Sequence, residues 1–287
     1  MYRTAWWFWV ALLLRVSGHK VVYDCHENLP VQVLQKDWIP RRLRRAMVPA
    51  VWAAEWLGSR LTSGVIVARD AILKRFPKDR TVLVRNFPTK SAMQQLQGGV
   101  PVESRPNVVI YAGVLSRVRG ISELVRAFES PQLVDAELFL VGEFNDQGFK
   151  NEILGSLPRN VHWFGQRSYD EVLKLYKSAK VGALLLYPTP SHRYSLPVKL
   201  FEYLGAGLPV VASSFPEFSD LVEGCGIQVD PQDVSQVTNA LQKILLAGAE
   251  ELSRMSAIAR NRVQERLRWE PEGRRLVTFC SALIAEP

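Results

Sequence analysis

The segment from Arg193 to Ser213 carries residues that could bind an anion. Pro197 can start a helix at its first position, and a Gly-Ala-Gly sequence can end it. Lys199 and Glu202 lie three residues apart, so both project from one face of that helix near its N-terminus. Unpaired backbone N–H groups and the helix dipole favour an anion there. The segment predicts a phosphate site beside a polar pair, and an ordinary solvated lysine–glutamate pair is the alternative.

A second candidate anion site is the loop from Gly113 to Gly120, which contains Arg117 and Arg119. Arginine binds phosphate in a bidentate manner and stays charged, while glycine lets the backbone approach an anion. Ligand groups in open parallel sheets come from the loops after strands, so we expect this loop and the Lys199 helix to converge on one edge. The chain has no GxGxxG after a strand and no GxxxxGK[ST], so neither a standard dinucleotide site nor a P-loop is expected.

A third candidate is His26, in the sequence Asp-Cys-His-Glu from Asp24 to Glu27. It follows the strand-like run Val21–Tyr23 and is the only histidine in the chain with acidic residues on both sides. The end of a strand is where open α/β sheets place ligand groups. A catalytic role and a structural role both remain open at this point.

The second part of the chain alternates strand-like and helical patterns in a regular way. The expected strands are Val108–Tyr111, Glu137–Val141, Val161–Phe164, Val181–Leu186, Pro209–Ala212 and Gly226–Val229. Ser168 and Glu171 form a capping-box start for one of the helices between them. Continuous apolar strands alternating with helices predict a parallel sheet covered on both faces, hence a doubly wound domain.

The first part of the chain predicts a smaller α/β region. The apolar run Ala5–Leu14 is too short to span a bilayer, and we interpret it as a buried helix packed on a sheet rather than a targeting or membrane-inserting segment. Residues Ile39–Leu61 form a basic amphipathic helix region, compatible either with an anionic lipid surface or with a core helix that has a solvated basic face. Strands are expected at Val65–Ala68 and Thr81–Val84.

The stretch Asn86–Pro106 has little periodicity and is the best domain boundary, so we expect domains at 1–100 and 101–287. The chain has 287 residues, of which 47% are apolar and 22% charged, which is ordinary globular composition. Its net charge of +8 comes from residues 1–100, which carry 16 Lys and Arg against 6 Asp and Glu. The three cysteines form no CxxC pair, which argues against a disulfide framework or a zinc site and favours a cytoplasmic protein.

Taken together, these motifs resemble those of the retaining family 4 glycosyltransferases of GT-B fold. The loop Gly113–Gly120 is similar to their glycine, basic residue and glycine loop, and Glu202–Ser213 resembles their donor-binding signature. Asp24–Glu27 resembles the Asp-x-His-Glu of bacterial members that build polysaccharides. The resemblance implies two Rossmann-like domains of GT-B type, the C-terminal one complete and doubly wound and the N-terminal one partial.

The resemblance also implies roles for individual residues. Arg119 occupies the usual lysine position that contacts the donor diphosphate, and Glu202 matches the second glutamate of the paired motif, which holds the donor ribose. His26 would face the sugar from the other domain. The remaining donor-binding residues implied by the resemblance are Gly113, Arg117, Leu196, Pro197, Val198 and Lys199. The family's chemistry retains the anomeric configuration and needs neither a metal nor a cofactor besides the nucleotide-diphosphate sugar itself.

Three positions depart from the family pattern. The first glutamate of the paired motif would lie eight residues before Glu202, where this chain has Tyr194. The arginine that often follows the loop glycine is Val114, and Arg117 can replace it. The strand and glycine-rich loop that come before the Asp-x-His-Glu strand in the family are not found, which is why we expect a partial N-terminal domain.

The expected function is sugar transfer from a nucleotide-diphosphate donor to a glycan or lipid-linked acceptor. A non-catalytic, donor-binding remnant that lacks the acceptor half is the alternative. The basic first third leaves a peripheral position at the inner membrane face open. A nucleic-acid partner is not expected, because the basic cluster Arg41–Arg45 belongs to no recognised nucleic-acid-binding motif.

Overall fold

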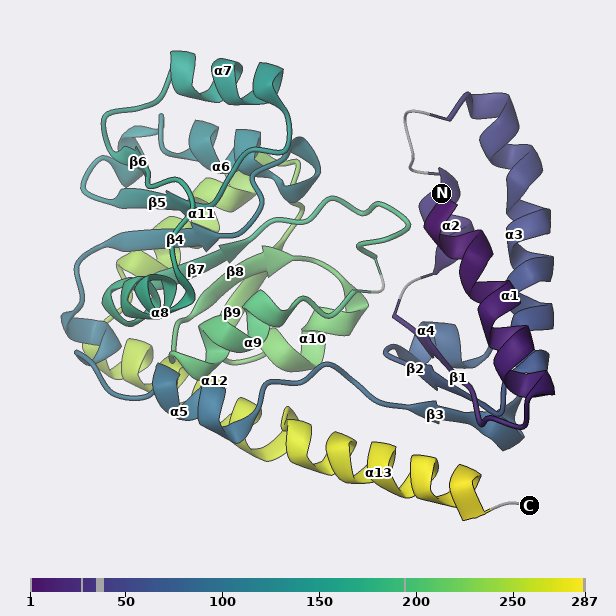
Figure 1. The fold of residues 1–287 in the computed structure, drawn as a ribbon. Coiled ribbons are helices and arrows are strands. Elements are labelled where there is room, and N and C mark those ends of the chain that lie inside the picture. Colours follow the sequence, from purple (N-terminus) through teal and green to yellow (C-terminus); the bar gives the residue numbers. More distant parts are fainter. Residues whose placement is uncertain (1, 27, 35–38, 194, 286–287) are drawn as a thin grey trace. The chain divides into compact units, whose positions relative to one another are not determined.

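The computed structural model describes residues 2–26, 28–34, 39–193 and 195–285. The chain forms two compact units (Figure 1), one made of Met1–Phe87 with Trp269–Pro287 and the other of Pro88–Arg268. We call them unit 1 and unit 2. The division differs from the expected domains 1–100 and 101–287, because the last helix joins unit 1: Phe279 and Leu283 pack closely against the backbone at Gly64.

Unit 2 contains a six-stranded, all-parallel sheet in the order β6-β5-β4-β7-β8-β9. Its strands are β4 (Val108–Ala112), β5 (Glu137–Val141), β6 (Val161–Trp163), β7 (Val181–Leu184), β8 (Val210–Ser213) and β9 (Gly226–Val229). All six expected strands are therefore confirmed. All five residues of β4 and all four residues of each of β7 and β8 are buried, as expected for strands covered on both faces.

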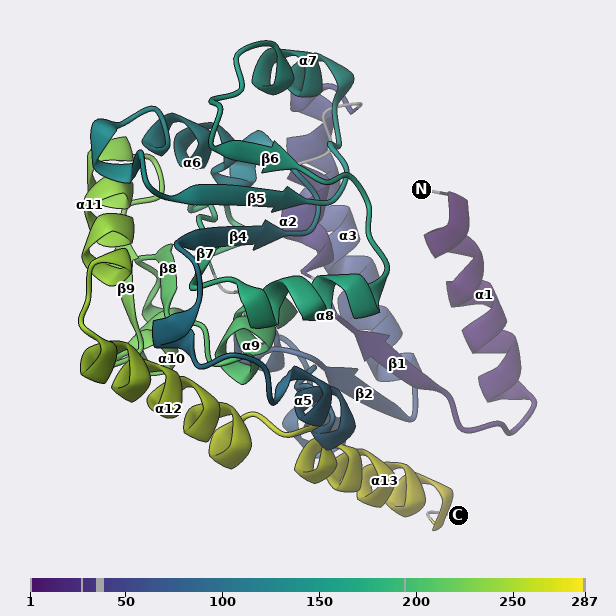
Figure 2. The same ribbon diagram turned by 90° about the vertical axis from the view of Figure 1, so that its left-hand side faces the viewer.

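Helices cover both faces of this sheet (Figure 2). They are α5 (Lys90–Leu96), α6 (Ile121–Ala127), α7 (Gln147–Gly155), α8 (Tyr169–Ser178), α9 (Val198–Gly205), α10 (Pro216–Val222), α11 (Val234–Leu245) and α12 (Ala249–Arg266). The main core joins α6 and α11 to one face, while on the other face the ring of Tyr203 in α9 packs against Gly182. The doubly wound expectation is thus confirmed.

Local sequence signals start several of these helices as expected. Ser168 and Glu171 form the complete capping box of α8. Asp146 caps α7 by accepting a 2.7 Å hydrogen bond from the backbone N–H of Phe149. Pro197 lies one position earlier than expected, at the N-cap of α9 rather than inside its first turn. These starts fix where the loops at the ends of the strands begin and end.

Unit 1 contains a three-stranded parallel sheet in the order β1-β2-β3 within the described residues. Its strands are β1 (Val22–Cys25), β2 (Gly64–Val67) and β3 (Thr81–Leu83), and its helices are α1 (Tyr2–Val16), α2 (Leu29–Leu34), α3 (Arg41–Leu61), α4 (Asp70–Leu73) and α13 (Trp269–Ala285). The smaller parallel sheet, accompanied by helices, confirms a second α/β unit of Rossmann-like type. No helix in the described parts of the chain is long and apolar enough to cross a bilayer.

The expectation of a buried helix at Ala5–Leu14 is wrong for the side chains that the structure describes. The segment is helical, as α1, but Trp9, Leu13 and Val16 are 67%, 69% and 81% exposed. The reason is that α1 contacts α3 and does not pack closely on the sheet, because a cavity lies between α1 and β1. This surface is considered again below.

Candidate functional site

The strand order of unit 2 places its topological switch point between β4 and β7, and we call the region outside the carboxyl ends of these two strands the crevice. The order of connections reverses between these two strands, and open α/β sheets bind ligands outside the carboxyl ends of strands at such a point. Gly113 directly follows β4, and α9 lies between β7 and β8 in the chain. The two anion-binding segments expected from the sequence therefore meet at one edge of the sheet.

Lys199 and Gly113 are in direct contact at this edge. The side chain of Lys199 runs so close to Gly113 that a Cβ at residue 113 would overlap the ammonium group. Gly113 also has a φ of +133°, which L side chains rarely adopt. The ammonium lies 5.2 Å from the ring centroid of Tyr111, the last but one residue of β4. Glycine at 113 is thus required both by the backbone and by the lysine.

Arg119 is the second cation of the cluster. It ends the 3-10 helix η3 (Arg117–Arg119), and Gly120, with a φ of +65°, turns the chain into α6. Burial raises the pKa of Tyr111, and the neighbouring Arg119 opposes this shift, which places the guanidinium next to the Tyr111 hydroxyl. Two cations thus flank one buried tyrosine at the end of β4.

The pKa of Lys199 reflects burial and two charged neighbours. Burial lowers the pKa of Lys199 to about 8, Arg119 lowers it further, and Glu202 only opposes this shift. An anion that approaches a half-buried lysine next to an arginine raises the pKa of the lysine, because the anion stabilises the charged form.

This shift predicts how the free energy of unfolding depends on pH. Lys199 has a folded-state pKa of about 8, below its ordinary value of 10.5, so between these values the unfolded state binds more protons and stability rises with pH. Chemical denaturation at pH 8 and pH 10.5 measures this rise in the free energy of unfolding. We expect the rise that comes from Lys199 in wild type and in the exposed control Lys174→Met, but not in Lys199→Met. Equal pH dependence in all three proteins would contradict the assignment.

Glu202 lies one turn after Lys199 and is held by two tyrosines of α8. Its Oε2 accepts a 3.1 Å hydrogen bond from the Tyr176 hydroxyl, and Tyr169 also hydrogen-bonds to the carboxylate. Burial raises the pKa of Glu202, whereas both hydrogen bonds and the charge of Lys199 oppose this shift. The carboxylate is thus positioned at the rim of the crevice.

These two tyrosines were not among the site residues expected from the sequence. Tyr169 and Tyr176 are seven residues apart, so they lie on one face of α8, and this spacing was the available signal. Tyr203 was missed as well, and its hydroxyl accepts a 3.2 Å hydrogen bond from the backbone N–H of Ala112 at the end of β4. Together they hold α8, α9 and β4 in a fixed arrangement around the crevice.

The segment Leu196–Val198 forms the start of α9. The N-cap residue Pro197 makes no side-chain capping hydrogen bond, so the first backbone N–H groups of α9 are not capped by their own N-cap residue. Val198 is exposed beside them. An anion-binding role for this helix start stays a prediction. Tyr194, where a carboxylate was expected in the family pattern, lies outside the described residues.

Arg117 points to a different partner. Its guanidinium forms a two-pronged ion pair with Glu152 of α7, with Nη1 2.9 Å from Oε1, and lies 4.6 Å from the ring centroid of Phe149. The pair is about half exposed on both sides. Arg117 thus braces the loop from outside, whereas Arg119 lies at Tyr111.

His26 belongs to unit 1 and lies directly after β1. Its Nε2 lies 2.9 Å from Oδ2 of Asp24, and its Nδ1 lies 3.2 Å from the side-chain amide nitrogen of Asn86. These contacts orient a half-exposed ring at the end of β1. Glu27 lies outside the described residues. No group of three His, Cys, Asp or Glu side chains that could hold a metal occurs among the residues described.

Comparison with known proteins gives a consistent match. The family model described as glycosyl transferases group 1 matches residues 94–262. The structure of HepE from Anabaena in complex with UDP superposes with a TM-score of 0.72 at 16% identity, over 96% of this chain and 76% of that one. No curated protein matches at a significant level.

Two further solved structures share the fold. Sucrose-phosphate synthase from Thermosynechococcus elongatus gives a TM-score of 0.70 at 23% identity, over 98% of this chain and 72% of the synthase. WaaG, a glycosyltransferase involved in lipopolysaccharide biosynthesis, gives a TM-score of 0.66 at 19% identity, over 96% of this chain and 82% of WaaG. At such identities the likeness concerns the fold, which is that of GT-B glycosyltransferases.

Proposed function

Because the chain belongs to the group 1 glycosyl transferases, whose family model matches residues 94–262, we propose that it transfers a sugar from a nucleotide-diphosphate donor to a glycan or lipid-linked acceptor. The observation that carries this proposal is the convergence of Arg119, Lys199 and the start of α9 on the crevice beside Gly113. HepE, which shares the fold, was solved with UDP. In this proposal the donor diphosphate is the anion that Arg119 and Lys199 bind.

The donor diphosphate lies across the end of β4 in this proposal. Arg119 and Lys199 bind its oxygens, and the backbone N–H groups at Leu196, Val198 and the first turn of α9 meet the distal phosphate. Gly113 lets the phosphates approach the backbone. Glu202 accepts hydrogen bonds from the ribose hydroxyls, and the half-exposed ring of Tyr169 forms the adjacent wall. Arg117, engaged by Glu152, supports the loop from outside.

These groups act mainly on the departing diphosphate. As the bond between the anomeric carbon and the phosphate oxygen breaks, negative charge grows on that oxygen, and the fixed cations and helix start stabilise it without a metal ion. The acceptor hydroxyl attacks from the same face of the sugar, which retains the configuration, and its proton passes to the departing phosphate oxygen. His26, oriented by Asp24, is the residue of unit 1 that we assign to the sugar.

Nucleotide binding tests the proposal directly. We expect at least one nucleoside diphosphate to bind in a calorimetric titration of the folded chain. Arg119→Ala should weaken that binding by about 10- to 100-fold, since a hydrogen bond to a charged group contributes about 1.5–3 kcal/mol. Binding of the matching nucleoside without phosphates should change little.

The exposed Arg126→Ala on α6 is the matched control and should bind like wild type. If circular dichroism shows a folded chain that binds none of the nucleotides, the proposal is wrong.

A second candidate is donor binding without catalysis. It is favoured by the small sheet of unit 1, which has three strands in the described residues against six in unit 2. Transfer of a labelled sugar to any acceptor by this chain alone would exclude it.

We also propose a peripheral position at the inner face of the membrane. The exposed side of α3 carries Trp52 and Trp56 together with arginines, and Glu55, the one acidic residue of this fully described helix, is buried. Tryptophan and arginine on one helix face are typical of helices that lie on anionic lipid.

A further inference from the structure

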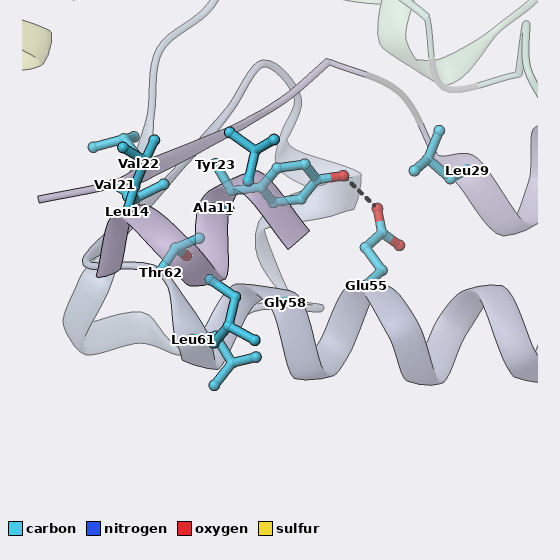
Figure 3. A pocket seen from close by; sticks show the side chains of 12 residues that line it. Ala11, Leu14, Val21, Val22, Tyr23, Leu29, Glu55, Gly58, Leu61 and Thr62 are labelled. Carbon is cyan, nitrogen blue, oxygen red and sulfur yellow. Dashed lines mark hydrogen bonds between the residues drawn. The ribbon is translucent and has the colours of Figure 1, made fainter. Parts of the chain in front are cut away.

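Unit 1 encloses a cavity that the proposed transfer reaction does not use. Its volume is about 390 Å³ and it lies between α1, β1, the start of α2 and α3 (Figure 3). Apolar side chains form most of its wall, among them Ala11 and Leu14 of α1, Leu29 of α2 and Leu61 of α3. Pockets of 300 Å³ and more are of the size that binds small organic ligands.

The polar groups of the cavity wall are already satisfied. Tyr23 points across the cavity and donates a 3.2 Å hydrogen bond to Oε1 of Glu55 (Figure 3). The carboxylate of Glu55 is also paired with Arg75 of unit 1, so its charge is neutralised. Thr62 is buried at the other end and donates its hydroxyl proton to the carbonyl of Ser59. The wall therefore offers an apolar surface and no unpaired charge, which suits a hydrocarbon.

The cavity opens at the surface beside cationic side chains. Leu14 and Leu61, which line it, are each 40% exposed, so the cavity reaches solvent between them. Arg15 follows Leu14 and donates from Nε to the carbonyl of Leu61 at 3.2 Å, which fixes the guanidinium at this opening. Arg60 precedes Leu61 and lies over the ring of Trp56 at 3.7 Å.

We propose that this cavity binds the single hydrocarbon chain of a lipid phosphate, with the phosphate at Arg15. A cavity of about 150 Å³ lined by aliphatic and aromatic side chains holds benzene, so 390 Å³ has room for about a dozen carbon atoms. Arg15 complements the phosphate, and the neutral wall accepts the chain. The proposal concerns unit 1 alone and does not depend on the proposed sugar transfer.

A series of alkyl phosphates with 6 to 14 carbons, each below its micelle concentration, tests the proposal by calorimetry on the full chain. We expect the affinity to rise about fourfold per added methylene, the equivalent of about 0.8 kcal/mol, and to level off near a dozen carbons. The alcohol of the same length should bind more weakly, and Arg15→Gln should remove that difference.

Ala11→Phe fills the cavity from α1 and should weaken dodecyl phosphate binding at least tenfold. Ala53→Phe, at an exposed position of α3 that does not line the cavity, is the matched control and should bind like wild type. Thermal unfolding checks that both variants are folded. If Ala11→Phe does not fold, the chain-length series on wild type still tests the proposal. Affinity independent of chain length, equal binding by both variants, or binding to anionic vesicles without binding to monomeric alkyl phosphates would each overturn the proposal.

Discussion

Lys199→Met is expected to lower the turnover number for sugar transfer by about 10²- to 10³-fold at saturating donor, the usual cost of removing one group that stabilises charge in a transition state. Methionine keeps the length of the side chain beside Gly113 but removes the charge that meets the leaving diphosphate. Folding should not suffer, because burial already disfavours the charged form of Lys199 and lowers its pKa to about 8. Steady-state kinetics and thermal unfolding separate the two effects.

The same lysine gives the reaction a pH dependence. Diphosphate binding requires the protonated amine, so wild-type affinity for the nucleoside diphosphate should fall as the pH rises above about 8, while the affinity of Lys199→Met stays low and flat. Lys174→Met, at an exposed position of α8, is the control and should behave like wild type. Turnover of Lys199→Met within a few-fold of wild type would show that the cation cluster does not serve the leaving group.

Arg105→Met is expected to destabilise unit 2 by about 3 kcal/mol or more. Arg105 is 2% exposed and donates to the carbonyls of Tyr176 and Ala179 at 3.3 and 3.0 Å and to that of Ala206 at 3.4 Å. Its loss removes the donor at the carbonyls of Tyr176 and Ala179, at about 1–3 kcal/mol each, whereas the carbonyl of Ala206 keeps a 3.5 Å hydrogen bond from Arg260. The loss is partly offset because burying the guanidinium is itself costly and lowers the pKa of Arg105 to about 10. Urea denaturation measures the change.

Because the carbonyls belong to the ends of α8 and α9, Arg105→Met should also weaken nucleotide binding by loosening Tyr176 against Glu202. The exposed Arg254→Met on α12 is the matched control and should lie within about 0.5 kcal/mol of wild type. A loss below about 1 kcal/mol for Arg105→Met would mean that water replaces the guanidinium at these carbonyls.

The parts of the fold that sequence patterns predicted are those that local rules decide. The six strands of unit 2 are apolar runs long enough to be buried, and the capping box at Ser168 starts α8 where expected. The convergence of Gly113 and Lys199 followed from one topological rule about the ends of parallel strands. The likeness of the motifs to the family is confirmed by the family model over residues 94–262.

Other features depend on partners far away in the chain. The apolar run Ala5–Leu14 predicted a buried helix, yet burial depends on what packs against α1, and in the structure a cavity lies between it and β1. Arg117 and Arg119 look alike in the sequence. One pairs with Glu152, 35 residues further along, and the other lies at Tyr111.

The sequence by itself determined the fold class and the meeting of the Gly113 loop and the Lys199 helix at one edge of the sheet, because apolar periodicity and helix-start signals act between neighbours in the chain. Only the tertiary structure decided the burial, the pKa values and the hydrogen-bond partners of the side chains. The lowered pKa of Lys199, the tyrosine partners of Glu202, the buried clamp of Arg105 and the cavity of unit 1 all arise from burial and from contacts between distant segments. Burial depends on the whole surrounding structure, so no local pattern encodes it.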